Sequence, residues 1–101
     1  MILWLDDIRS PKKYGYPDAY WAKTAEEAIT ILQTGAVTFA SLDHDLSEMA
    51  IIGLAPSDEK TGYDVVRWME ENGVWPSGGV KVHSMNPVGK ARMEAVIARA
   101  Y

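Results

Sequence analysis

The segment SLDHDLS, residues 41–47, places an imidazole between two carboxylates directly after an apolar run. Like charges this close raise the free energy of a folded protein unless a cation or a proton relieves their repulsion. Two more acids follow another apolar run at the N-terminus. Carboxylates without thiolates suit a hard divalent cation such as Mg²⁺ or Mn²⁺. The candidate metal ligands are therefore Asp6, Asp7, Asp43 and Asp45.

Polar residues also follow a third apolar run, which ends in His83 and Ser84. The ordinary pKa of an imidazole suits proton transfer near neutral pH. We therefore expect His83 to act as a general acid, with His44 as the second candidate and Asp43 as the central catalytic carboxylate. A site neutralised by a metal can also accept a phosphate. The candidate phosphate-binding residues are Arg9, Ser84, Asn86 and Lys90.

Alternating strands and helices are expected to position these residues. The hydrophobic patterns predict strands at 2–5, 19–23, 36–42 and 80–84, and helices at 24–35, 61–73 and 86–100. Such alternation implies a parallel sheet. Lys81, in the middle of the last predicted strand, indicates an edge strand with one wet side. We expect a small three-layer α/β fold of the flavodoxin type, with strand order 2-1-3-4, about three helices and a long loop at 44–60.

The carboxyl ends of parallel strands meet at one edge of a sheet, and ligands bind where the strand order reverses. Asp6, Asp7 and Asp43 should therefore converge. Each polar residue also has a purely structural interpretation: the acids as turn caps or solvated loop residues, His83 as a buried hydrogen-bonded side chain, Asn86 as a helix cap and Lys90 as a surface charge. These interpretations do not explain why three strands deliver polar groups to one edge.

Composition bounds the remaining possibilities. The chain has 101 residues, of which 48% are hydrophobic, and this suits one domain at 1–101. It has no cysteine, so disulfides and thiolate metal sites are excluded. The net charge of −4 argues against a broad surface for duplex DNA. No signal-peptide core or membrane-spanning run is present in the sequence, and we expect a cytoplasmic location with no membrane partner.

Four motifs resemble the cyclic-phosphate processing receiver domain family, a compact relative of response-regulator receivers. They are LDDIR (5–9), SLDHDL (41–46), TGYDVVRWM (61–69) and VHSMNPVGKARM (82–93). The resemblance implies that Asp6 and Asp7 correspond to the receiver metal-binding pair. It also implies that Asp43 corresponds to the phosphoacceptor and Ser84 to the receiver hydroxyl residue. The first receiver helix is replaced by the loop 8–18, and the fifth strand, the last helix and the phosphate-contacting lysine are missing.

The resemblance implies processing of cyclic phosphates, such as the 2′,3′-cyclic ends of RNA. The leading hypothesis is a metal-dependent phosphodiesterase that acts on a small nucleotide or an RNA end, either by direct water attack or through an aspartyl-phosphate on Asp43. One alternative is a non-catalytic module that binds a nucleotide or a phosphorylated partner. Another is a signalling receiver phosphorylated on Asp43. A third is an interaction protein that uses the apolar stretch 49–56.

Overall fold

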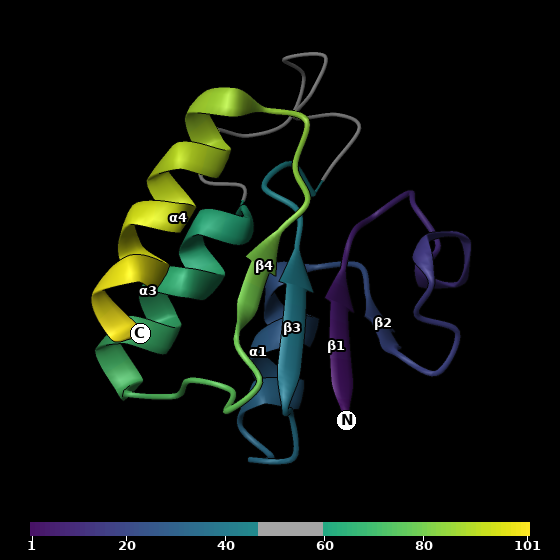
Figure 1. Ribbon diagram of the computed structural model, residues 1–101, viewed down its shortest axis with the longest axis horizontal. Coiled ribbons are helices and arrows are strands. Elements are labelled where there is room, and N and C mark those ends of the chain that lie inside the picture. The colour runs from purple at the N-terminus through teal and green to yellow at the C-terminus, as the bar shows by residue number, and fades with distance from the viewer. Residues whose placement is uncertain (47–59) are drawn as a thin grey trace.

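A computed structural model describes residues 1–46 and 60–101 (Figure 1). Its strands are β1 (Ile2–Leu5), β2 (Tyr20–Ala22), β3 (Phe39–Leu42) and β4 (Val80–Val82). Its helices are η1 (Pro11–Tyr14, a 3-10 helix), α1 (Ala25–Leu32), α3 (Gly62–Asn72) and α4 (Pro87–Ala100). Every predicted strand and helix is present. β1 has the predicted bounds, whereas β2, β3 and β4 are shorter than expected. The predicted loop 44–60 lies mostly, and the apolar stretch 49–56 entirely, outside the described residues.

The four strands form one parallel sheet in the order β2-β1-β3-β4, as predicted. Leu3 of β1 lies between Tyr20 of β2 and Ala40 of β3. Lys81 is exposed on β4, which confirms that this strand lies at an edge. The carboxyl ends of β1 and β3 are therefore neighbours, and that of β4 lies next to them.

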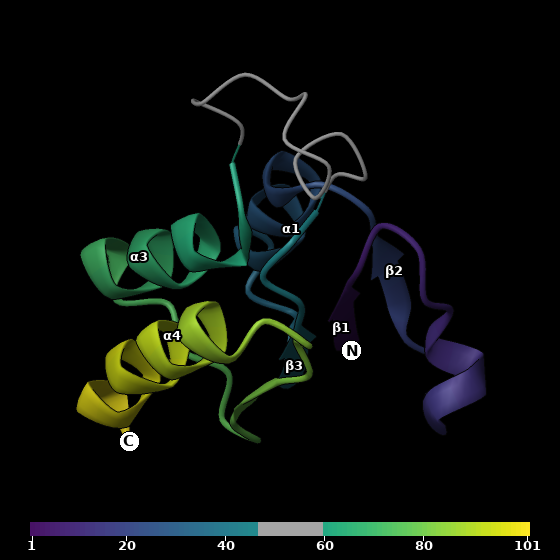
Figure 2. The same cartoon turned by 90° about the horizontal axis from the view of Figure 1, so that it is seen from above.

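One face of the sheet carries the hydrophobic core. Alternate strand residues point to this face because side chains alternate along a strand. They pack with apolar residues of all three α-helices, and Figure 2 shows α1, α3 and α4 on the same side of the sheet. The core residues include Leu3, Leu5, Ala40, Leu42 and Val82 from the strands, and Leu32, Val66, Met69, Met93 and Val96 from the helices.

The opposite face is covered by the segment that contains η1 rather than by a helix of several turns (Figure 2). Trp4 of β1 points to this face, is 1% exposed, and stacks on Tyr14 at a ring-centroid distance of 5.4 Å. Pro11 and Gly15, which has φ +90°, favour a short 3-10 turn over a longer helix here. The third layer of the predicted architecture is thus this aromatic segment.

Side-chain caps begin each of the three α-helices. The Thr24 hydroxyl accepts a hydrogen bond from the N–H of Glu27 at the start of α1. Thr61 and Asp64 form a reciprocal capping box on α3. On α4, the side-chain oxygen Oδ1 of Asn86 accepts a hydrogen bond from the N–H of Gly89. The cap at Asn86 agrees with the structural interpretation of that residue in the sequence, and all three caps use residue types that favour helix starts. None of the helices in the described part of the chain is both long and apolar enough to cross a bilayer.

Candidate functional site

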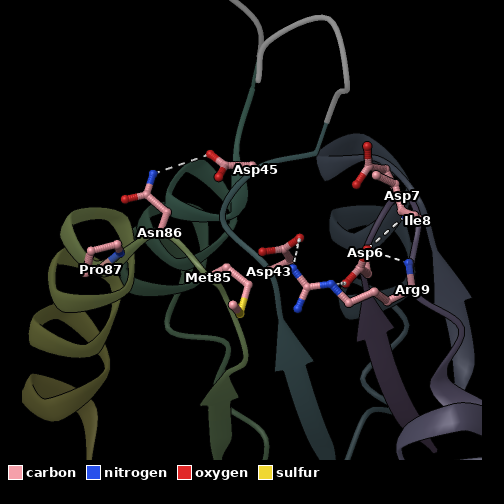
Figure 3. A pocket seen from close by; sticks show the side chains of 9 residues that line it. All are labelled: Asp6, Asp7, Ile8, Arg9, Asp43, Asp45, Met85, Asn86 and Pro87. Atoms are coloured by element: carbon pink, nitrogen blue, oxygen red, sulfur yellow. Dashed lines mark hydrogen bonds and ion pairs between the residues drawn. The ribbon is translucent and has the colours of Figure 1, made fainter. Parts of the chain in front are cut away.

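A cleft of about 370 Å³ opens at the carboxyl ends of β1, β3 and β4 (Figure 3). The predicted convergence of Asp6 and Asp43 is present there, because both carboxylates lie in its wall. Four acidic residues and one basic residue line the described part of this cleft. Its described lining consists of Asp6, Asp7, Ile8, Arg9, Asp43, Asp45, Met85, Asn86 and Pro87.

Asp6 is fully buried and both of its carboxylate oxygens are hydrogen-bonded. Its Oδ1 accepts from the backbone N–H groups of Ile8 at 2.9 Å and Arg9 at 2.8 Å. Its Oδ2 lies 3.1 Å from Nε2 of His83. The turn that follows β1 therefore folds around this carboxylate, which holds it in one orientation.

Asp43 is 4% exposed and follows β3 directly. Its Oδ1 accepts from the backbone N–H of His44 at 2.8 Å. Burial, followed by the negative charge of Asp6, raises the pKa of Asp43 from 3.8 to about 6. Hydrogen bonds from His44 and Ser84 and the charge of Arg9 oppose this rise. The raised pKa is the electrostatic sign of two carboxylates that share a poorly solvated site.

Arg9 places a cation beside both carboxylates. Its Nε lies 3.5 Å from Oδ2 of Asp6, and its Nη2 lies 4.0 Å from Oδ2 of Asp43. Its Nη1 donates to the backbone carbonyl of His83 at 3.2 Å. Figure 3 shows the guanidinium reaching between the two aspartates from the turn after β1. The guanidinium thus relieves part of the repulsion between the two carboxylates, a role that the sequence analysis gave to a metal ion alone.

His83 lies beneath the cleft and is absent from its described lining. Its ring stacks on Trp4 at a centroid distance of 4.1 Å. Burial lowers the pKa of His83 below its ordinary value, against the opposing effect of the Asp6 carboxylate, and this favours the neutral imidazole. Because the Asp6 carboxylate can only accept, Nε2 donates to it, and Nδ1 accepts from the Ser41 hydroxyl at 2.7 Å. Both ring nitrogens of His83 are therefore occupied in fixing Asp6.

Asp45 lines the opposite side of the cleft and is bonded to His44, which, like His83, is absent from the described lining. Nδ1 of His44 lies 2.9 Å from Oδ1 of Asp45, whose side chain is 37% exposed. The same carboxylate oxygen accepts from Nδ2 of Asn86 at 3.5 Å. Within the described part of the chain, Nε2 of His44 has no hydrogen-bond partner. This wall holds its groups with fewer and longer bonds than the wall around Asp6.

The remaining predicted phosphate ligands are divided between the cleft and its surroundings. Asn86 lines the cleft, where its side chain also caps α4. Ser84 is buried, accepts from the backbone N–H of Asn86 at 3.0 Å, and contributes to lowering the pKa of Asp43. Lys90 does not line the cleft. The structure therefore brings together Arg9, Asn86 and the four aspartates, supports them with Ser84 and His83, and leaves Lys90 outside.

Two glycines let the helices approach this loop closely. A Cβ at Gly62 would overlap the backbone carbonyl oxygen of Asp43, and a Cβ at Gly89 would lie 2.5 Å from the His44 ring. The N–H of Gly62 also donates to the carbonyl of His44 at 2.9 Å. The starts of α3 and α4 are thus packed directly against the segment that carries Asp43, His44 and Asp45.

The donor set fits a hard divalent cation. One ligand atom each from Asp6, Asp43 and His83 lies within 4.8 Å of the others. His83 uses Nε2 to donate to Asp6, so the two carboxylates are the better ligands. Asp7 and Asp45 line the same cleft and add oxygen donors to its walls. Oxygen ligands of this kind suit Mg²⁺ or Mn²⁺.

A comparison with known protein families matches residues 1–99 to the cyclic-phosphate processing receiver domain. The chain belongs to this family. No curated protein is significantly similar to it. The match confirms the family that the four motifs indicated, and it covers all the elements that build the cleft. As a receiver domain, the chain carries Asp6 and Asp43 at the ends of neighbouring strands, β1 and β3.

Sequence reasoning missed three features of this receiver domain. It did not find Ser41, the hydrogen-bond partner of His83, although a serine in the middle of a buried strand was a signal. It did not anticipate that Trp4 would stack on His83. It also placed Arg9 among the phosphate ligands alone, whereas the guanidinium lies beside two carboxylates. These features depend on which face of the sheet a side chain occupies, and neither spacing nor motif specifies that.

Proposed function

We propose that this receiver domain is a divalent-metal-dependent phosphoesterase that hydrolyses cyclic phosphates, with a 2′,3′-cyclic nucleotide or RNA end as substrate. The observation that carries the proposal is the pair of buried carboxylates, Asp6 and Asp43, at the wall of an open cleft. Membership of a family described as cyclic-phosphate processing supports this substrate class. A purely structural role does not account for two acids held side by side away from water.

Asp6 and Asp43 would hold the cation, with Asp7 and Asp45 as further oxygen donors. When bound, Mg²⁺ or Mn²⁺ polarises a phosphoryl oxygen and lowers the pKa of a coordinated water. Asp6 reaches the cleft already oriented by two backbone N–H groups and by His83. Such preorganisation reduces the free energy needed to assemble the site at the moment of reaction.

Groups from two sides of the cleft would bind the phosphate. Arg9 supplies the cationic group in the described lining, and Asn86 supplies an amide from the start of α4. The N-terminal end of a helix carries a partial positive charge that favours anions. Because the cleft is otherwise acidic, a phosphate would enter it only alongside a bound cation.

Hydrolysis of a cyclic phosphate forms one P–O bond from water and breaks the bond to one ribose oxygen. That leaving oxygen must receive a proton, while the attacking water loses one. We assign proton donation to His44, because Asp45 orients its Nδ1 and its Nε2 has no partner among the described residues. His83, with both nitrogens bonded beneath the cleft, is a positioning residue for Asp6.

The test is turnover of 2′,3′-cyclic nucleotides by the purified chain with Mg²⁺ or Mn²⁺, followed by chromatography of the products. We expect hydrolysis that stops when the metal is chelated and falls at least 10³-fold in Asp43→Asn, since metal ligation contributes several kcal/mol to the barrier. The matched control is Asp18→Asn, which makes the same chemical change at an exposed residue outside the cleft. A folded protein that turns over no cyclic phosphate would contradict the proposal.

A second candidate, phosphorylation of Asp43 as in a signalling receiver, is favoured by one contact. The Ser84 hydroxyl lies close enough to the Asp43 carboxylate to lower its pKa, as expected of a receiver hydroxyl residue. Incubation with acetyl phosphate and intact-mass measurement separates the candidates. A lasting phosphoryl adduct that Asp43→Asn abolishes, without turnover of cyclic nucleotides, supports a signalling receiver instead.

A further inference from the structure

Arg9 lies where a metal bound to Asp6 and Asp43 would need room. Its guanidinium contacts Oδ2 of Asp6 at 3.5 Å and Oδ2 of Asp43 at 4.0 Å. Among the described residues that line the cleft, Arg9 is the one with a basic side chain. A guanidinium and a divalent ion are both attracted by the same pair of negative charges.

We propose that Arg9 and the divalent cation compete for these carboxylate oxygens, so that the ion binds only when the guanidinium leaves them. This inference rests on the metal site proposed above and adds a residue that sets its affinity. Without the ion, Arg9 stabilises the folded protein by partly neutralising Asp6 and Asp43. With the ion, the guanidinium turns to the open cleft, where the phosphate would lie.

The local structure permits this movement without refolding. The backbone of Arg9 is fixed by its own N–H, which donates to Asp6, and by its carbonyl, which accepts from Nε1 of Trp4 at 2.9 Å. The side chain is 29% exposed and lines the cleft, so it can rotate outward from a fixed backbone. Its distances to the two carboxylates exceed those of tight charge-assisted hydrogen bonds, so releasing them costs little compared with a bidentate ion pair. The movement also breaks the 3.2 Å hydrogen bond from Nη1 to the His83 carbonyl, which water in the open cleft can replace on the guanidinium.

Titration of the full chain with Mn²⁺, followed by the electron paramagnetic resonance signal of the free ion, tests the competition. We compare the wild type with Arg9→Gln and with Lys13→Gln, which removes the same charge from an exposed residue of η1 outside the cleft. Arg9→Gln should bind Mn²⁺ roughly tenfold tighter, the usual scale for removing one charge from direct contact with a site. Lys13→Gln should change the affinity less than about twofold, because solvent and salt screen it.

Thermal unfolding supplies a second readout. With a chelator present, Arg9→Gln should melt below the wild type, because the repulsion between Asp6 and Asp43 is no longer relieved. Saturating Mn²⁺ should raise its melting temperature more than that of the wild type. Should Arg9→Gln fail to fold without metal, Arg9→Lys keeps the charge but lacks the forked guanidinium, and should bind Mn²⁺ roughly threefold tighter than the wild type.

The outcomes separate this inference from the function on which it rests. Equal or weaker Mn²⁺ binding in both Arg9 variants, with measurable binding by the wild type, overturns the competition and leaves the metal site in place. An absence of Mn²⁺ binding in the wild type and in both Arg9 variants overturns the metal site itself, and the competition with it. Binding by an Arg9 variant alone supports the competition in its strongest form.

Discussion

The two walls of the cleft are built differently. On the β1 side, Asp6 is fully buried and accepts two backbone hydrogen bonds of 2.9 Å or less, while His83 fixes its second oxygen. On the α4 side, Asp45 is 37% exposed in its side chain and is held by His44 at 2.9 Å and Asn86 at 3.5 Å. The first wall is thus fixed by a fully buried carboxylate, and the other, around Asp45, is partly solvated.

This difference indicates a division of tasks. A cation needs ligands that stay in place, and the buried network around Asp6 would supply them. A proton donor must exchange its proton with solvent or substrate. The side chains of His44 and His83 are 14% and 12% exposed, so their hydrogen bonds separate them. Both ring nitrogens of His83 are bonded, whereas Nε2 of His44 has no partner among the described residues. Asp43 lies between the walls, and its pKa is raised because burial disfavours the charged carboxylate.

The largest expected effect on kcat/KM comes from substituting one aspartate in each wall and comparing the two variants. Asp6→Asn should lower kcat/KM for cyclic nucleotides at least 10³-fold and abolish Mn²⁺ binding, because a fixed ligand is lost. Asp45→Asn should lower kcat/KM only about tenfold, since in the proposed site Asp45 orients His44 and is a further oxygen donor beside the two main ligands, Asp6 and Asp43. Steady-state kinetics on both variants measure the contrast, and equal losses would remove the division of tasks.

The two histidines sharpen the same comparison. His44→Gln should lower kcat about 10²-fold with little change in stability, as expected for a lost general acid. His83→Gln should instead reduce the free energy of unfolding by about 2 kcal/mol, because it breaks buried bonds to Ser41 and Asp6 and the stack on Trp4. Urea unfolding and the pH profile of kcat distinguish the roles. A general acid must be protonated to act, so its removal abolishes the alkaline limb of the pH profile. Loss of that limb in His83→Gln alone would reverse the assignment.

The sequence predicted the fixed wall better than the partly solvated one. Abrupt changes from apolar runs to acids marked the ends of β1 and β3, and the flavodoxin-type strand order made Asp6 and Asp43 neighbours before the structure placed them there. The caps at Thr61 and Asn86 are local patterns and were equally predictable.

Features that depend on tertiary packing were not predictable. The position of His83 beneath the cleft results from its stack on Trp4 and its bond to Ser41, which join three strand segments distant in sequence. The covering of the second sheet face by η1 arises from the same aromatic contacts. The placement of the Arg9 guanidinium is a rotamer choice that a linear motif does not encode.

Acidification tests the buried charge of Asp43. Its pKa rises from 3.8 to about 6 on folding, so between these values the folded state binds more protons than the unfolded chain. The stability that this group contributes is complete below about pH 4 and is lost as the pH rises through 6, a change of roughly 2–3 kcal/mol in the free energy of unfolding.

The measurement is urea unfolding from pH 4 to 7 in the presence of a chelator. The difference between the wild type and Asp43→Asn should grow in favour of Asn with rising pH, whereas Asp18→Asn should follow the wild type throughout. A pH-independent difference would show that Asp43 keeps an ordinary pKa in the folded protein.

The smallest expected effect concerns the packing of α4 on the partly solvated wall. Gly89→Ala would push a methyl group to within 2.5 Å of the His44 ring, and we expect a loss of about 1–2 kcal/mol in stability and severalfold in kcat. Val88→Ala, at a residue that is 69% exposed, is the matched control and should change neither. Calorimetry and kinetics on the pair measure the contrast, and an unaltered Gly89→Ala protein would show that His44 does not need its close contact with α4.

The central claim is that Asp6 and Asp43 together bind a divalent ion. The most direct test is the anomalous diffraction signal of a crystal soaked in Mn²⁺. The account predicts one strong peak between the two carboxylates, with oxygen ligands from both and the Arg9 guanidinium turned away from them. A soaked crystal with no peak at this position, and with Arg9 still beside both carboxylates, would contradict it.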